Sequence, residues 1–389
     1  MLAEPTEVPV EAPLARQHKL YRVFVQLVRG FGARQWSQHW ASGKIPGVSE
    51  RLPYGYHRVA DGNCSITYSE DCDEPRSIEA LRRGQRRLLG FDFLHVWRNR
   101  KNILNADIVW THTELEHLAV LLLFQSIPRN RRPKLIAQSV WLFDRWKTLS
   151  RLKRWGYRYL LEQADVLAVM SPENLKIARS LFPRAQVELI LFGINKDSIV
   201  TPARRTCHRP LRIASLGNDL DRDWSTLIGA LKNVNAYDVR IASRHVGRDQ
   251  IADSKNVTVL QPSSAREITE LLRWADVMVL CMKPNHHACG ITAIEEAVLF
   301  GVPVICTDIG GLRAYFSEDE LCFVSPFNPG SIRQALERLA GNDELRFQMA
   351  TRAQSRMRRA GLSSRAYAGR FREISERLLR ELPIEGASL

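Results

Sequence analysis

The feature that most constrains the fold is an alternation of strand-like and helix-like stretches, which occurs in two runs. Short apolar stretches are each followed by a stretch of helical length, first across residues 20–191 and again across 211–340. Residues 195–209 between the runs are polar, contain Pro202 and are typical of a linker. Such an alternation predicts a parallel sheet covered on both faces. The chain is therefore predicted to be an α/β protein with two doubly wound domains.

The expected elements follow from this pattern. Strands are predicted at 20–28, 106–110, 134–140, 165–170, 187–191, 211–216, 239–242, 257–260, 277–281 and 303–306. Helices are predicted at 113–124, from 141 to about 162, from 172, and at 224–231, 265–274, 292–300, 330–340, 343–359 and 363–380. The predicted division is a disordered tail at 1–18, an N-terminal Rossmann-like domain at 19–198 and a C-terminal Rossmann-like domain at 199–362, with a last helix at about 363–381 that packs back on the first domain.

Composition narrows the class of protein. The 389 residues are 45% hydrophobic and 25% charged, which is typical of a globular chain. No apolar run reaches the roughly 18–20 residues that span a bilayer, and the N-terminus lacks the apolar segment of a secretory signal. Seven cysteines without a C-x-x-C pair favour a reducing cytoplasm. The net charge of +14 favours an anionic partner, either nucleic acid, a phospholipid surface or a nucleotide-like substrate.

The positive charge is concentrated in the first half of the chain. Residues 128–158 contain ten lysines and arginines against one acid, Asp144, with aromatic residues between them. A second basic cluster comprises Arg82, Arg83, Arg86 and Arg87. Segment 128–158 has three interpretations: a solvated face over core aromatics, a basic amphipathic helix on an anionic membrane, or a grip on nucleic-acid phosphates.

A candidate anion site follows the strand predicted at 277–281. In open parallel sheets, ligands bind beyond the carboxyl ends of the strands. Gly290 allows a close backbone approach, Thr292 is expected to cap the next helix, and the amides of Gly290, Ile291 and Thr292 would face an anion at the positive helix end. Glu296 lies one turn further along the same face, within reach of a hydroxyl-bearing group. The alternative is an ordinary capped helix with solvated glutamates.

These residues carry a resemblance to a known family. The run C-G-I-T-A-I-E-E-A at 289–297, followed by G-V-P-V-I at 301–305, resembles the donor-binding signature of GT-B glycosyltransferases, particularly the retaining family 4 (group 1) enzymes. Further segments resemble that family's landmarks in the same order: 106–112, 164–171, 192–195, 215–217 and 274–277. The resemblance implies two Rossmann-like domains that face each other across a cleft, with the nucleotide-sugar donor on the second.

The resemblance also implies which residues hold the donor phosphates. The family's basic phosphate loop corresponds to the stretch from Gly217 to Trp224, in which Arg222 replaces a lysine and Asn218 stands where the family has an arginine. A guanidinium binds phosphate through two hydrogen bonds, where lysine acts as a point charge. Lys283, just past a predicted strand end, is the second candidate cation. Solvated surface positions are the alternative for both cations.

Sugar contacts and catalysis are expected from other positions. Glu296 matches the family's second motif glutamate, which binds the ribose, and we expect it to be essential for catalysis. The first motif glutamate falls at Ala288, so we expect the neighbouring His287 to contact the sugar instead. His112 follows a strand end in the first domain and is expected to assist at the reacting centre; a structural histidine is the alternative.

The expected function is a glycosyltransferase of the EC 2.4 class that moves a hexosyl or glycuronosyl group to a glycan or lipid-linked acceptor. The enzyme is expected to act in cell-surface or exopolysaccharide synthesis, to retain the anomeric configuration, and to need no cofactor or metal. A metal held by His286, His287 and Cys289 is the alternative. The protein is expected to be cytoplasmic and to associate peripherally with the inner face of the plasma membrane through segment 128–158. Nucleic acid is not an expected partner. The alternative function is a non-catalytic two-lobed nucleotide- or glycan-binding protein, which the missing first glutamate favours.

Overall fold

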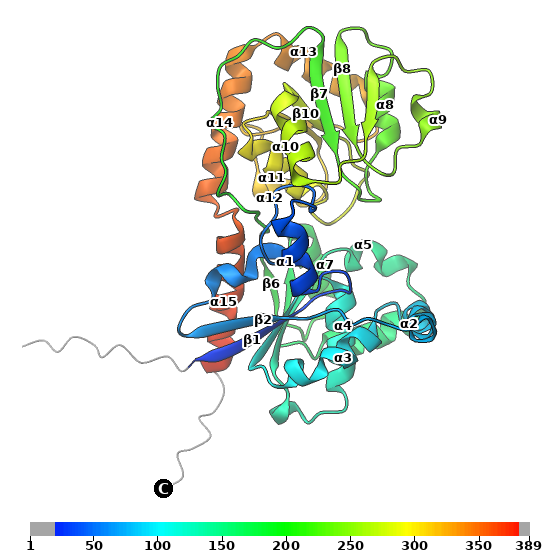
Figure 1. Ribbon diagram of the computed structural model, residues 1–389, viewed down its shortest axis with the longest axis vertical. Coiled ribbons are helices and arrows are strands. Elements are labelled where there is room, and N and C mark those ends of the chain that lie inside the picture. Colours follow the sequence, from blue (N-terminus) through cyan, green and yellow to red (C-terminus); the bar gives the residue numbers. More distant parts are fainter. Residues whose placement is uncertain (1–19, 381–389) are drawn as a thin grey trace, which may run out of the picture.

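The computed structural model describes residues 20–380, so the tail predicted at 1–18 lies outside the described residues. The chain forms two lobes, each built on a six-stranded sheet with helices on both faces (Figure 1). All paired strands of both sheets run parallel. The predicted fold class, two doubly wound α/β domains, is confirmed.

The first lobe, here called the N-lobe, has the strand order β2-β1-β3-β4-β5-β6. Its strands are β1 (Tyr21–Gln26), β2 (Cys64–Tyr68), β3 (Ile108–Thr111), β4 (Lys134–Ser139), β5 (Val166–Val169) and β6 (Val187–Leu189). Every residue of β3 and β5 is buried, as expected for strands covered on both faces. Its helices are α1 (Ala33–Ala41), η1 (Pro53–Val59), α2 (Arg76–Leu89), α3 (Phe93–Leu104), α4 (Glu114–Phe124), η2 (Arg129–Arg131), α5 (Leu142–Arg145), η3 (Trp146–Thr148), α6 (Arg151–Leu161) and α7 (Pro172–Leu181).

The second lobe, the C-lobe, has the strand order β12-β11-β10-β7-β8-β9. Its strands are β7 (Leu211–Leu216), β8 (Tyr237–Ala242), β9 (Val257–Leu260), β10 (Val277–Leu280), β11 (Val304–Thr307) and β12 (Cys322–Val324). Its helices are α8 (Trp224–Leu231), α9 (Arg248–Ile251), α10 (Ala265–Trp274), α11 (Ile291–Leu299), α12 (Leu312–Tyr315), α13 (Pro329–Ala340) and α14 (Asp343–Arg359). The chain winds outward in opposite directions from β7 and β10, so the switch point lies between these two strands.

The last helix, α15 (Ser364–Arg380), returns to the N-lobe (Figure 1). The indole of Trp110 on β3 donates to the hydroxyl of Ser375, and Phe371 packs edge-on against Tyr56. Where α15 begins, the chain pairs with the interlobe connector: the amide of Ser364 donates to the carbonyl of Ile194 at 2.9 Å. The two chain segments that cross between the lobes therefore touch each other.

The structure differs from the sequence-based expectation in two places within the N-lobe. The elements α1, β2, α2 and α3 were not predicted. No residue of α1 or α2 is fully buried, so neither helix carries the buried apolar face by which a helix is usually identified. The single helix predicted from 141 to about 162 is wrong. It breaks after η3, and Ser150 starts α6 by accepting from the amide of Lys153. None of the helices within residues 20–380 is long and apolar enough to cross a membrane.

Candidate active site

A cavity of about 310 Å³ opens at the switch point of the C-lobe sheet. Its walls come from the loops after β7, β8 and β10, from the start of α11, and from a loop of the N-lobe that follows α1. The structure brings six of the predicted donor-site residues together here: Gly217, Asn218, Arg222, Gly290, Thr292 and Glu296. They come from two separate stretches of chain, the loop after β7 and the start of α11, which meet because parallel strands end at the same edge.

Arg222 is the charged centre of this cavity. Its side chain is buried, with the residue 5% exposed, yet Nε and Nη1 have no hydrogen-bond partner among the described residues. The guanidinium lies against two glycines with positive φ, Gly217 at +144° and Gly290 at +80°. A Cβ at Gly290 would lie 2.7 Å from Nη1, and one at Gly217 would overlap Nε. Both glycines are needed to admit this side chain, whose unpaired N–H groups can donate to an anion.

The N-terminus of α11 adds backbone donors beside Arg222. The helix begins at Ile291 with Gly290 as its N-cap, so the predicted capping role of Thr292 is wrong, and no side chain caps this end. The amide of Ile291 donates to the carbonyl of Ala288 at 3.2 Å, which leaves the amides of Thr292 and Ala293 at the open helix end. A positive helix end next to a buried guanidinium is an anion-binding arrangement.

Glu296 closes the other side of the cavity. Its carboxylate is buried, and Oε1 accepts a hydrogen bond of 2.7 Å from the backbone amide of Val48, in the N-lobe. Burial raises the pKa of Glu296 to about 7. The neighbouring Glu295 is fully buried and does not line the cavity. Glu296 is therefore the carboxylate that can meet a ligand, and the N-lobe loop at 43–48 lies directly over it.

His287 connects the two lobes beside the cavity. Its Nδ1 lies 2.7 Å from Oδ2 of Asp144 on α5, and its Nε2 lies 3.8 Å from Oδ2 of Asp219, which lines the cavity. Burial by itself lowers the pKa of His287, but the two carboxylates outweigh it and raise the pKa to about 11. His287 is therefore an imidazolium at neutral pH.

The same contacts bear on metal binding. The candidate ligand atoms of Asp219, His287 and Cys289 lie within 4.8 Å of one another. The same ring also forms an interlobe contact, in which His287 lies between the carboxylates of Asp144 and Asp219. His286 contributes to this interlobe contact through its backbone, because its amide donates a hydrogen bond of 2.5 Å to Oδ1 of Asp144.

His112 lies in the N-lobe and does not line the 310 Å³ cavity. Its Nδ1 lies 3.0 Å from the hydroxyl of Tyr56, 3.2 Å from that of Tyr367 and 3.3 Å from Nε2 of Gln138. Burial lowers the pKa of His112 to about 3, so the ring is neutral. Because Nδ1 faces these donors, we place the ring proton on Nε2, where it can be donated to a ligand. The ring stacks on Tyr54 at 3.4 Å between centroids.

Two other predicted residues do not reach the cavity wall. The side chain of Lys283 is exposed and the side chain of Ile291 is buried, and neither residue lines the cavity. Sequence reasoning missed Arg244, which lines the cavity just after β8 and follows the same strand-end rule as the predicted residues. It also missed Pro46 and Gly47, for which the sequence holds no signal because they come from the other lobe.

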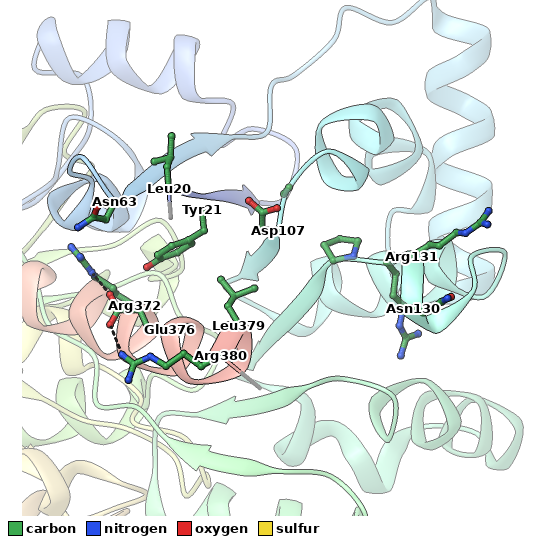
Figure 2. Close-up of a pocket in the computed structure, with 13 residues that line it drawn as sticks. Leu20, Tyr21, Asn63, Asp107, Asn130, Arg131, Arg372, Glu376, Leu379 and Arg380 are labelled. Atoms are coloured by element: carbon green, nitrogen blue, oxygen red, sulfur yellow. Dashed lines mark hydrogen bonds and ion pairs between the residues drawn. The ribbon is translucent and has the colours of Figure 1, made fainter. Parts of the chain in front are cut away.

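Two further cavities lie in the N-lobe. One, of about 540 Å³, opens at the carboxyl end of β1, and its lining includes Gly30, Asp71, Arg86 and Glu116. The other, of about 450 Å³, lies at the opposite edge of the same sheet, where Tyr21, Asp107 and Arg372 line it (Figure 2). Ligands of open parallel sheets bind at the carboxyl ends, so the 540 Å³ cavity is the one that faces the same way as the predicted cleft.

The comparisons with known proteins agree with this geometry. A sequence model of the family described as "Glycosyl transferases group 1" matches residues 250–356, a stretch that contains Glu296. Sucrose-phosphate synthase from Thermosynechococcus elongatus has a TM-score of 0.67 at 15% identity, and the match covers 93% of this chain and 100% of that one. HepE from Anabaena, in complex with UDP and glucose, has a TM-score of 0.64 at 11% identity, covering 92% and 100%.

TarM from S. aureus has a TM-score of 0.56 at 13% identity, covering 72% of this chain and 58% of that one. No curated protein sequence matches the chain. At these identities the structural likeness shows the fold, and the predicted GT-B architecture is confirmed. The predicted resemblance to group 1 glycosyltransferases is confirmed over the matched residues, and it supports a glycosyltransferase enzyme.

Proposed function

We propose that this chain transfers a sugar from a nucleoside-diphosphate donor, bound at the C-lobe switch point, to an acceptor held by the N-lobe. The observation that carries the proposal is Arg222, a buried guanidinium with free N–H groups beside the open end of α11. A diphosphate is the anion that fits both the guanidinium and the helix end. HepE, a protein with the same fold, has been determined with UDP and with UDP-glucose, so uridine nucleotides are the first ligands to test.

The donor contacts divide along the cavity. Arg222 and the amides of Thr292 and Ala293 would stabilise the charge that grows on the departing diphosphate. Glu296 would accept hydrogen bonds from the ribose hydroxyls, which places the nucleoside toward α10 and Pro262. The sugar then points the other way, toward Asp219 and the imidazolium of His287. Because protein groups neutralise the diphosphate, this mechanism needs no divalent metal.

The N-lobe would supply the acceptor and a hydrogen-bond donor. The neutral ring of His112, with its proton on Nε2, would donate to the donor sugar or the leaving oxygen once the lobes close. Closure aligns the reactants and excludes water, which would otherwise hydrolyse the donor. The 540 Å³ cavity at the end of β1 is the proposed acceptor site. Retention of configuration is proposed from the family resemblance.

A membrane-bound acceptor would suit the exposed surface of α6. Segment 128–158, the predicted membrane contact, is not one surface, since it contains the buried strand β4. Within it, α6 exposes Leu152, Trp155 and Tyr159 beside Arg151 and Arg158. We propose a lipid-linked or glycan acceptor, peripheral association with an anionic cytoplasmic membrane face, and a role in cell-surface polysaccharide synthesis. Nucleic acid is not a proposed partner.

The variant Arg222→Gln tests the donor site. It keeps a polar side chain but shortens it and removes its charge, so the affinity for UDP should fall about 10- to 100-fold, the loss expected for charge-assisted hydrogen bonds. Isothermal titration calorimetry measures this directly. Lys283→Gln, which makes the same change at an exposed position, should bind UDP as the wild type does. If all three proteins bound UDP with equal affinity, Arg222 would not be part of the diphosphate site.

A non-catalytic nucleotide- or glycan-binding protein remains the second candidate. It is favoured by Ala288, an apolar buried residue where the related enzymes carry their first motif glutamate. The release of UDP from UDP-sugars distinguishes the two functions. An enzyme releases UDP when a suitable acceptor is added, whereas a binding protein with the same UDP affinity releases none with any acceptor in a panel of glycans and lipid-linked sugars.

A further inference from the structure

Helix α2 is unusual because none of its 14 residues is buried. Helices in proteins gain most of their stability from packing an apolar face, and on α2 this packing is limited to the half-buried Leu89 at its end. Its sequence carries five arginines and a single acid, Glu79. The helix lies at the outer edge of the N-lobe, away from α15 and the C-lobe (Figure 1).

The inner side of α2 is held by polar contacts. The guanidinium of Arg82 lies 2.9 Å from Oε2 of Glu74 and 3.0 Å from Oδ2 of Asp92, with its side chain 11% exposed. The side-chain amide of Gln85 donates to the carbonyl of Phe91 and accepts from the amide of Phe93. These contacts fix the helix in place and leave its outer side free for another role.

The outer side combines apolar and cationic side chains. Leu81 and Leu88, seven residues apart and so on one face, are 63% and 74% exposed. Arg83 and Arg87 are exposed one turn apart, and within residues 20–380 the ion pair of Arg83 is a long contact of 4.0 Å with Glu79. Leucines of this exposure cost free energy in water unless a partner covers them.

Helix α6 extends the same kind of surface. Lys153 donates to the carbonyl of Arg87 at 3.4 Å and Tyr157 donates to that of Leu89 at 2.6 Å, so α6 lies against the end of α2. On α6, Leu152 is 76%, Trp155 69% and Tyr159 55% exposed. We call these exposed faces of the two helices, with their arginines, the α2–α6 surface.

We propose that the α2–α6 surface docks the protein on an anionic lipid bilayer, with α2 lying in the plane of the headgroups. Leucine and tryptophan side chains would enter the acyl boundary while the arginines meet lipid phosphates. A nucleic-acid surface would use the arginines but would gain nothing from Leu81 and Leu88. The proposal deepens the membrane part of the proposed function, adds α2 to it, and does not depend on donor binding.

Vesicle binding tests the proposal on the full-length protein. The wild type should co-sediment with vesicles made of equal parts phosphatidylcholine and phosphatidylglycerol, and much less with phosphatidylcholine alone. Each cation near such a surface contributes about fivefold to binding, so Arg83→Glu/Arg87→Glu should weaken it at least about 25-fold. Leu81→Ser/Leu88→Ser, which leaves the charge unchanged, should weaken it about tenfold or more.

The matched control is Arg129→Glu/Arg131→Glu, the same charge change at exposed positions of η2 within segment 128–158. The affinity of this variant for the anionic vesicles should stay within about threefold of that of the wild type, since the substitutions alter only the net charge. Because every substituted side chain is exposed, all variants should keep the wild-type circular dichroism, melting temperature and UDP affinity. Three results would each overturn the proposal. The wild type could fail to bind the anionic vesicles, or the control could lose as much vesicle binding as the α2 variants. The wild type could also bind duplex DNA tightly, with an affinity that Leu81→Ser/Leu88→Ser leaves unchanged.

Discussion

At the scale of the residue, adjacent glutamates on α11 meet different environments. Glu295 is fully buried, neither of its oxygens has a hydrogen-bond partner among the described residues, and burial raises its pKa well above the usual value. Glu296 faces the cavity and accepts from Val48. A helical step of about 100° separates the two side chains. Sequence similarity selected Glu296 through its distance to Gly301, and the structure places that residue at the cavity.

The raised pKa of Glu296 predicts a pH dependence of donor binding. The carboxyl ionises as the pH rises through about 7, and the ionised form accepts hydrogen bonds from ribose hydroxyls more strongly. The affinity for UDP-glucose should therefore increase severalfold between about pH 6 and about pH 8. Titration calorimetry at several pH values measures it. Glu296→Gln should bind weakly and show a flat profile, and an unchanged slope in that variant would assign the dependence to another group.

At the scale of the element, the C-lobe was predicted far better than the N-lobe. The bounds of β7, α8 and α14 coincide with the predicted 211–216, 224–231 and 343–359. Each has a buried strand pattern or a clear apolar face. In the N-lobe, α2 lacks a buried apolar face, because polar contacts and the half-buried Leu89 hold it and its other leucines, Leu81 and Leu88, are exposed. The usual relation between apolar spacing and burial therefore does not identify this helix.

The same limit applies to the candidate site. Gly217, Arg222 and Gly290 were predictable because all three follow strands that end at one edge of the sheet. Gly47 and Asp144 were not predictable, since they reach the site from the N-lobe loop after α1 and from the short helix α5. Contacts between residues more than a hundred positions apart leave no periodic trace in one sequence.

The contact between α5 and His287 predicts a stability effect that depends on pH. Removing the partner charge in Asp144→Asn should cost about 1–3 kcal/mol near neutral pH, measured by chemical denaturation. The pKa of His287 is raised from 6.5 to about 11, so the stabilisation is complete below about pH 6.5 and is lost as the pH rises toward 11. The difference between variant and wild type should therefore shrink at about pH 10.

Asp319→Asn is the matched control for this comparison, because Asp319 is exposed and makes only a long contact of 3.7 Å with Arg352. It should stay within about 0.5 kcal/mol of the wild type at every pH. A constant cost of Asp144→Asn across the whole range would show that the carboxylate acts through packing and not through the charge of His287.

At the scale of the whole molecule, the N-lobe is completed by the far end of the chain. Helix α15 packs on η1 and β4, and Phe371 lies fully buried among Tyr56, Trp110 and Tyr367. The N-lobe is therefore not a continuous stretch of sequence, whereas the C-lobe, from β7 to α14, is one. The N-lobe core forms only after the C-lobe has been traversed, so folding of the two lobes is coupled through this helix.

Truncation of the buried ring in Phe371→Ala should destabilise the protein by about 3–5 kcal/mol, as measured by urea denaturation. This loss of stability should increase the rate of amide hydrogen exchange in β3 and β4, although residue 371 follows the C-lobe in sequence. Phe327→Ala removes an exposed ring and should change stability by less than about 0.5 kcal/mol. Increased exchange confined to the C-lobe would contradict the assignment of α15 to the N-lobe.

The contact between the two crossing segments has a mechanical consequence. Gly193 lies so close to the backbone of Ser363 that a Cβ there would overlap it, and Ile194 is paired with Ser363 beside it. The two segments that connect the lobes are thus fixed to each other here, while the contacts of Gly43 and Val48 with the C-lobe lie elsewhere along the interface. Because these segments cannot slide past each other without breaking their pairing, we expect the lobes to open by rotation about this point. Such a rotation would displace each residue in proportion to its distance from the pairing, so a small rotation would widen the far side of the interface most.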